Sequence, residues 1–174
     1  AKKFSKESGI ENIEFIEHNI LDLPFQDESF DFVFSKGVLH HTGDLEKGID
    51  EYSRLLKKGG HGFLYLYASG GIYWKSRNKM REVMSLIPME FAIKVLDSIG
   101  MPSRRTIFVD SWYVPVEDYV TSEFVERKFR GFNYKEIKRM KSNRAFELDK
   151  IVLENGKWAE DIWGEGELRY FLTK

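Results

Sequence analysis

The fold is decided by two runs, Phe30-Asp31-Phe32-Val33-Phe34 and Phe63-Leu64-Tyr65-Leu66-Tyr67, and by the pattern between them. Aromatic and β-branched residues favour pleated structure, so each run predicts a strand. The second run has no charged residue, as expected of a strand that is buried on both faces of its sheet.

A helix is expected between these strands. Asp44 is a good N-cap residue, and Lys57-Lys58 followed by Gly59-Gly60 is a stop signal. Apolar residues recur at helical spacing at Leu45, Ile49, Tyr52 and Leu56. Strand, helix and strand with short connections predict a βαβ unit and a parallel sheet of the α/β class.

The segments on either side predict further elements. Residues 1–9 have the pattern of a helix end that Gly9 closes, and Ile13–Ile16 is predicted to be a short strand. Residues 72–99 have an amphipathic helical pattern with Pro88 near a helix start, whereas residues 106–116 are predicted to be extended.

The last part of the chain predicts one helix and two strands. Thr121 or Ser122 caps a helix that Gly131 closes, and residues 134–140 form a strand. Asn155-Gly156 is a turn signal, and residues 168–173 are predicted to form a terminal strand.

Composition excludes several classes of protein. The chain has 174 residues, 15% of them aromatic, with 27 Lys and Arg against 28 Asp and Glu. Intrinsic disorder and a surface that is basic throughout are therefore excluded. The absence of cysteine excludes disulfides, thiolate catalysis and Cys-ligated metals. The longest apolar run, Phe63–Ala68, is too short to span a bilayer, so we expect no membrane partner and a cytoplasmic location.

Several spaced motifs resemble one enzyme family. The motifs are Asn19-Ile20-Leu21-Asp22-Leu23-Pro24-Phe25, Asp27–Val33, Ser35-Lys36-Gly37-Val38-Leu39-His40-His41, Asp44 and Arg54–Gly60. Together they resemble the class I S-adenosylmethionine-dependent methyltransferases, in their small-molecule branch. The resemblance covers roughly residues 10–68 and is weaker over 110–140. It implies a Rossmann-like, mostly parallel sheet flanked by helices, a helical lid or insertion over 72–109 and an antiparallel C-terminal strand, within one partial domain over 1–174.

The resemblance also implies part of a cofactor site. Asn19 stands where the family usually has an Asp that accepts from the adenine amino group, and the Ile20 backbone meets the adenine ring. Ser35, Lys36 and Gly37 lie beside the methionine part of S-adenosylmethionine, where a glycine allows close backbone approach. The alternatives are that Asn19 caps a turn and that Gly37 belongs to an ordinary tight turn.

The family's glycine-rich loop has no counterpart in this sequence, and neither has the acidic residue that holds the ribose. Gly70-Gly71 and Gly164-Glu165-Gly166 do not join a strand to a helix as that loop does. We therefore expect a chain that lacks the first strand–helix units, binds cofactor poorly and has impaired activity.

Catalysis and acceptor binding are assigned to two further groups. His40 or His41 is a candidate general base, because histidine titrates near neutrality. Tyr67, Tyr73, Trp74, Trp112 and Tyr113 are candidates for an aromatic pocket that binds a small-molecule methyl acceptor. The alternative for both groups is ordinary packing in the core and the lid.

Three other readings were weighed. No metal site is expected, because His18, His40, His41 and His61 lack metal-ligand spacing. A nucleic-acid substrate is a weaker alternative that depends on the basic groups Lys75, Arg77, Lys79, Arg81 and Lys135, Lys138, Arg139, Lys141, Arg144. The third is a non-catalytic chain that forms a homodimer through an unpaired sheet edge.

Overall fold

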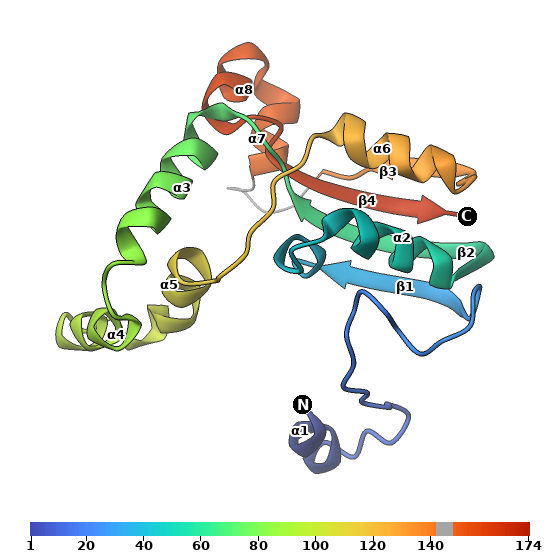
Figure 1. The fold of residues 1–174 in the computed structure, drawn as a ribbon, viewed down its shortest axis with the longest axis horizontal. Helices are drawn as coiled ribbons and strands as arrows, with labels where there is room; N and C mark the ends of the chain where they lie inside the picture. The colour runs from blue at the N-terminus through green and yellow to red at the C-terminus, as the bar shows by residue number, and fades with distance from the viewer. Residues whose placement is uncertain (142–147) are drawn as a thin grey trace.

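A computed structural model describes residues 1–141 and 148–174, and within them the sheet has four strands (Figure 1). The strands are β1 (Phe30–Lys36), β2 (Leu56–Tyr67), β3 (Glu136–Arg139) and β4 (Glu167–Thr173), in the order β1-β2-β4-β3. The β1–β2 pair is parallel, and β2–β4 and β3–β4 are antiparallel. The α/β class, the βαβ unit and the antiparallel terminal strand are confirmed, although the described sheet is mixed rather than mostly parallel.

Helices surround this sheet. They are α1 (Lys2–Glu7), η1 (Leu39–His41), α2 (Leu45–Leu55), α3 (Gly71–Met84), α4 (Met89–Ser98), η2 (Pro102–Arg104), α5 (Arg105–Trp112), α6 (Ser122–Gly131), α7 (Leu148–Asn155) and α8 (Lys157–Trp163). Both predicted caps are confirmed: Asp44 Oδ1 accepts from the Lys47 N–H at 3.0 Å, and Thr121 Oγ1 accepts from the Phe124 N–H at 3.2 Å.

The core lies on one face of the sheet, under α2 and α6. Its buried residues are Leu39, Leu45, Ile49, Tyr52, Leu56, Leu64, Leu66, Ala68, Val125, Phe129, Tyr134, Leu168, Tyr170 and Leu172. All four residues of the predicted apolar stripe belong to it. Phe63, Tyr65 and Tyr67 on the other face of β2 are half-buried, so the prediction that this strand is buried on both faces was wrong.

The boundary between α2 and β2 differs from the prediction. Leu56 is already extended, with φ −79° and ψ 126°, and Lys57 to Gly60 belong to β2. The register with β1 is irregular here, because Phe30 pairs with Leu56 but Phe32 pairs with His61. Lys57 Nζ lies 2.9 Å from Asp31 Oδ1, so the pair of lysines binds across to β1 instead of closing a helix.

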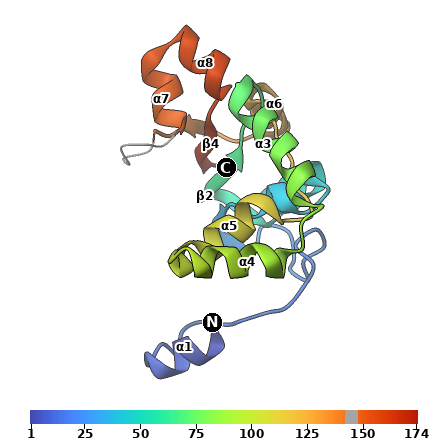
Figure 2. The same cartoon turned by 90° about the vertical axis from the view of Figure 1, so that its left-hand side faces the viewer.

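The predicted strand at Ile13–Ile16 is not formed. This segment is irregular, and Ile13 and Ile16 are each 48% exposed. A strand needs a neighbour for its backbone groups, and no described strand lies beside this segment. Figures 1 and 2 show α1 and the segment after it set apart from the sheet.

The segment between β2 and α6 is helical in α3, α4 and α5. Helices over 72–99 are confirmed, with Pro88 at the N-cap of α4. The extended structure predicted over 106–116 was wrong, because Arg105–Trp112 is helix α5. Phe108 and Trp112 are half-buried one helical turn apart, so packing against α3 and α4 overrides the β propensity of this stretch. Whether α3–α5 act as a lid stays a prediction.

The root of this helical segment is a close backbone crossing. A Cβ on Gly71 would overlap the Gly164 nitrogen, and a Cβ on Gly164 would overlap the Ser69 oxygen. Trp74 Nε1 donates to the Trp163 oxygen at 3.1 Å across the same crossing. Figure 2 shows α3 and α8 together at this end of the molecule. The turn predicted at Asn155-Gly156 joins α7 to α8, two helices that the sequence analysis did not predict.

Candidate functional site

The carboxyl ends of β1 and β2 lie at one edge of the sheet, because these strands are parallel. Gly37 follows β1 with φ +70°, and its N–H donates to the Tyr65 oxygen at 3.3 Å. A Cβ at this position would lie 3.7 Å from Cδ1 and Cε1 of the Tyr65 ring. The glycine therefore leaves bare backbone beside an aromatic ring. Ser35 is buried with its Oγ unpaired among the described residues, and Lys36 is exposed.

Asn19 and Ile20 do not follow a strand, contrary to the prediction. Asn19 is exposed, and its Oδ1 accepts from the Leu21 N–H at 3.0 Å, which is the geometry of a turn cap. Ile20 packs against the core. The alternative of a turn cap thus describes Asn19 in this structure, and contact of Asn19 and Ile20 with adenine stays a prediction.

The two candidate bases have different surroundings. His40 is fully buried and stacks on Tyr67, with ring centroids 4.0 Å apart. Neither of its ring nitrogens has a partner among the described residues. Burial lowers the pKa of His40 to about 3, and the nearby His41 and Arg77 add to this, so the ring is neutral at pH 7. His41 is half-buried, with Nδ1 2.8 Å from the Val116 oxygen.

An aromatic cluster continues from this edge of the sheet. We define the cluster as His40, Tyr67, Tyr73, Trp74, Tyr119 and Trp163. Ring centroids lie 5.3 Å apart for Tyr67 and Trp74, 5.1 Å for Trp74 and Tyr119, and 4.9 Å for Tyr73 and Trp163. The Tyr65 ring, beside Gly37, lies 5.9 Å from that of Tyr67 and so links the cluster to the end of β1.

The predicted aromatic residues are only partly brought together. Tyr67, Tyr73 and Trp74 meet in the cluster. Within the described part of the chain, no ring contact joins it to Trp112 or to Tyr113, whose ring lies 6.2 Å from Phe108. Sequence reasoning missed Tyr119 and Trp163. Both are brought in by long-range connections, and no local pattern marks either one.

A buried ionic group borders the cluster. The Glu117 side chain is 1% exposed and binds Arg77 Nη2 at 2.9 Å and Arg81 Nη1 at 2.5 Å. Tyr119 donates its hydroxyl to Glu117 Oε2 at 2.6 Å. The Arg77 guanidinium also lies 5.3 Å from the centre of the Tyr67 ring. Glu117 therefore anchors α3 to the segment that precedes α6.

These contacts remove most of the basic surface that favoured nucleic acid. Arg77 and Arg81 are turned inward onto Glu117, and Lys79 pairs with Glu82 at 2.8 Å. In the second group, Arg139 Nη2 donates to the Glu165 oxygen at 2.7 Å and Lys141 lies 4.0 Å from Glu154. Arg144 lies outside the described residues.

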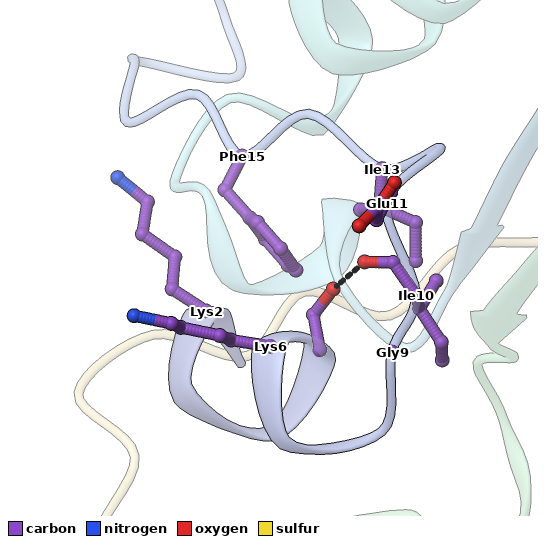
Figure 3. A pocket seen from close by; sticks show the side chains of 8 residues that line it. Lys2, Lys6, Gly9, Ile10, Glu11, Ile13 and Phe15 are labelled. Atoms are coloured by element: carbon purple, nitrogen blue, oxygen red, sulfur yellow. Dashed lines mark hydrogen bonds between the residues drawn. The ribbon is translucent and has the colours of Figure 1, made fainter.

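A pocket of about 290 Å³ lies away from these groups, between α1 and the segment after it (Figure 3). It is lined by Lys2, Ser5, Lys6, Gly9, Ile10, Glu11, Ile13 and Phe15. Ser5 Oγ donates to the Ile10 oxygen at 2.7 Å and ties the two walls together. No predicted site residue lines this pocket.

Metal and membrane features were sought in the same coordinates. Residues 1–141 and 148–174 contain no group of three or more His, Asp or Glu side chains arranged to hold a metal ion. In the same part of the chain, each helix is too short or too polar to cross a bilayer.

Comparison with known proteins agrees with the site at the end of β1. Residues 1–64, which include Gly37, His40 and His41, match the family model described as a methyltransferase domain. Over 60 residues the chain is 38% identical to the uncharacterized methyltransferase YcgJ of Bacillus subtilis, which is 34% of this chain and 24% of that protein. Over 53 residues it is 42% identical to the demethylmenaquinone methyltransferase of Clavibacter sepedonicus, which is 30% of this chain and 22% of that protein.

The fold extends this likeness beyond the matched segment. The crystal structure of YcgJ from Bacillus subtilis superposes with a TM-score of 0.60 at 17% identity, and covers 99% of this chain and 76% of that one. At that identity the comparison shows a shared fold. The sequence matches span about a quarter of the length of the curated relatives. The matched domain, the motifs within it and the shared fold show that this chain belongs to the class I S-adenosylmethionine-dependent methyltransferase family.

Proposed function

We propose that this chain binds S-adenosylmethionine at the carboxyl ends of β1 and β2 and takes part in moving its methyl group to a small-molecule acceptor. One observation carries the proposal. Gly37, inside the segment that matches the methyltransferase domain, leaves bare backbone at φ +70° beside the Tyr65 ring. Ligands of open α/β sheets bind at such strand ends.

The aromatic cluster supports a flat or apolar acceptor. Its rings begin at Tyr67, the last residue of β2, and continue to Trp163 across α3. Aromatic faces bind flat ligands by stacking. The cluster is largely closed in this conformation, because His40 and Trp74 are buried. The proposal therefore requires that α3 shifts to admit the acceptor.

Methyl transfer needs positioning and, for a protonated nucleophile, a base. The nucleophile attacks the methyl carbon, the carbon–sulfur bond breaks and its electron pair stays on sulfur as S-adenosylhomocysteine leaves. The acceptor's proton passes to a base. His41 suits this role better than His40. Its Nδ1 faces the Val116 carbonyl, which can only accept, so Nδ1 carries the hydrogen and Nε2 keeps a free electron pair.

Weak cofactor binding is part of the proposal. The sequence has no glycine-rich loop between a strand and a helix, and that loop is what the family uses for the methionine end of the cofactor. Binding by this chain would depend on the β1 edge and on the turn at Asn19. An acceptor that is a nucleic acid is not favoured, because the arginines of its strongest basic group are buried on Glu117.

Calorimetric titration of the 174-residue chain with S-adenosylhomocysteine tests the proposal. We expect saturable binding that Gly37→Val weakens at least about tenfold, because its side chain fills the space beside Tyr65. Gly59→Val is the matched control. Gly59 has φ +77° and open space around it at the other end of β2, so its variant carries the same backbone strain away from the site. The proposal fails if the chain shows no binding at millimolar ligand, or if the two variants lose affinity equally.

A further inference from the structure

β1 is an edge strand with one side unpaired. It pairs with β2 alone, and the Gly37 N–H that points to Tyr65 fixes which residues face that neighbour. Backbone groups alternate along a strand, so Val33 and Ser35 bond toward β2. Phe32, Phe34 and Lys36 therefore direct their N–H and C=O groups away from the sheet.

The side chains beside this open edge are apolar and exposed. Phe32 is 52% exposed and Phe34 is 61% exposed, both on the face that α2 and α6 do not cover. Phe34 stacks on Phe63 with ring centroids 5.0 Å apart and planes 16° from parallel. Exposed apolar side chains next to an unpaired edge are the usual features of a strand that pairs with another chain.

The sequence of β1 is complementary to itself when it is read in the opposite direction. If two copies pair antiparallel about Val33, Phe32 of each lies opposite Phe34 of the other, on the same face. The charges agree with this direction. Exposed Asp31 lies near the start of β1 and Lys36 at its end, so antiparallel pairing brings the basic end of one copy toward the acidic start of the other. The net charge of −1 leaves little repulsion between copies.

We propose that two copies of this chain associate through their β1 edges, antiparallel about Val33, so that one sheet runs through both copies and the Phe32 and Phe34 rings are buried between them. Val33 lies at the twofold axis. Its backbone groups point toward β2, so it faces its counterpart as a non-hydrogen-bonded pair, with Cα atoms about 4.5 Å apart.

Light scattering after size-exclusion chromatography tests the association. We expect a mass of twice 20.5 kDa that falls to 20.5 kDa on dilution. Phe34→Lys should shift the species to the monomer, because a charge on an edge strand opposes pairing. Phe91→Lys on α4 is the matched control, since Phe91 is 59% exposed and lies on the helical segment. Circular dichroism checks that both variants remain folded.

A cysteine variant tests the register. The chain contains no cysteine, so Val33→Cys supplies a single thiol at the axis, where the Cα separation suits a disulfide. Mild oxidation should join most of the Val33→Cys chains into covalent dimers, and Phe91→Cys chains should stay mostly single. A wild-type monomer at about 100 μM, where weak homodimers form, would overturn the proposal. So would a dimer that only Phe91→Lys dissolves, or equal crosslinking of the two cysteine variants. Cofactor titration is a separate measurement, so failure here leaves the proposed function standing.

Discussion

His40 is an imidazole held neutral by its surroundings. It is fully buried, and neither ring nitrogen has a partner in the described part of the chain. Its pKa is lowered from 6.5 to about 3 in the folded chain. Between these two values the unfolded chain binds a proton that the folded chain does not, so the stability that His40 contributes is present above pH 6.5 and is lost as the pH falls.

We therefore expect His40→Phe to flatten the pH dependence of stability. The wild-type free energy of unfolding should fall toward a slope of about 1.4 kcal/mol per pH unit below about pH 6.5. The phenylalanine keeps the stack on Tyr67 and removes the titrating group. Urea denaturation at several pH values measures both slopes, with exposed His18→Phe as the control. Equal slopes for His40→Phe and the wild type would contradict the assignment.

Asp44 shows which residue roles the sequence reveals. Its cap could be predicted because its partner, the Lys47 N–H, is three residues away. We expect Asp44→Ala to lower the free energy of unfolding by about 1 kcal/mol, and Asp44→Asn to cost much less because an acceptor oxygen remains. Urea denaturation would contradict this cap if the two variants were equally destabilised.

At the scale of the element, the predictions failed where a distant partner decides the structure. Ile13–Ile16 has the composition of a strand, but no described strand lies beside it. Arg105–Trp112 has the β-branched and aromatic residues of a strand, yet packs as a helix on its neighbours. The stripe of α2 was predicted correctly because helical spacing is a local signal.

The anchor of α3 gives a prediction at this scale. Glu117→Gln would leave Arg77 and Arg81 buried without their counter-charge, and we expect a loss of about 3 kcal/mol in the free energy of unfolding. Glu82→Gln is the control, because its pair with Lys79 is exposed and should contribute less than about 1 kcal/mol. Similar losses for the two variants, measured by urea denaturation, would show that Glu117 is not an anchor.

At the scale of the whole molecule, the sequence predicted the α/β class, the βαβ unit and the terminal strand, but not how the elements assemble. Tyr67 and Trp74 were named as neighbours, whereas Tyr119, Trp163 and Glu117 join them from segments 40 or more residues away from the arginine or tryptophan they contact. The roles of Gly37, His40 and His41 in a methyltransferase stay predictions.

Hydrogen exchange should reveal the uneven stability of the chain. β2 lies between β1 and β4, and its Leu64 and Leu66 are fully buried. α1 has Phe4 69% exposed and stands apart from the sheet (Figure 1). Amides of Leu64 and Leu66 should exchange slowest, and those of α1 at nearly the rate of unfolded chain. Strong protection of α1 would show that it packs on the rest of the chain.

The backbone crossing at Gly71 and Gly164 limits how the chain can be re-engineered or diverge. Neither position has room for a methyl group, and each is closed by the other's backbone. The place where α3 leaves the sheet is thus fixed, while the turn between α4 and η2 is at the surface. New sequence is best grafted at that outer turn, so the helical segment can serve as an exchangeable module whose root stays constant.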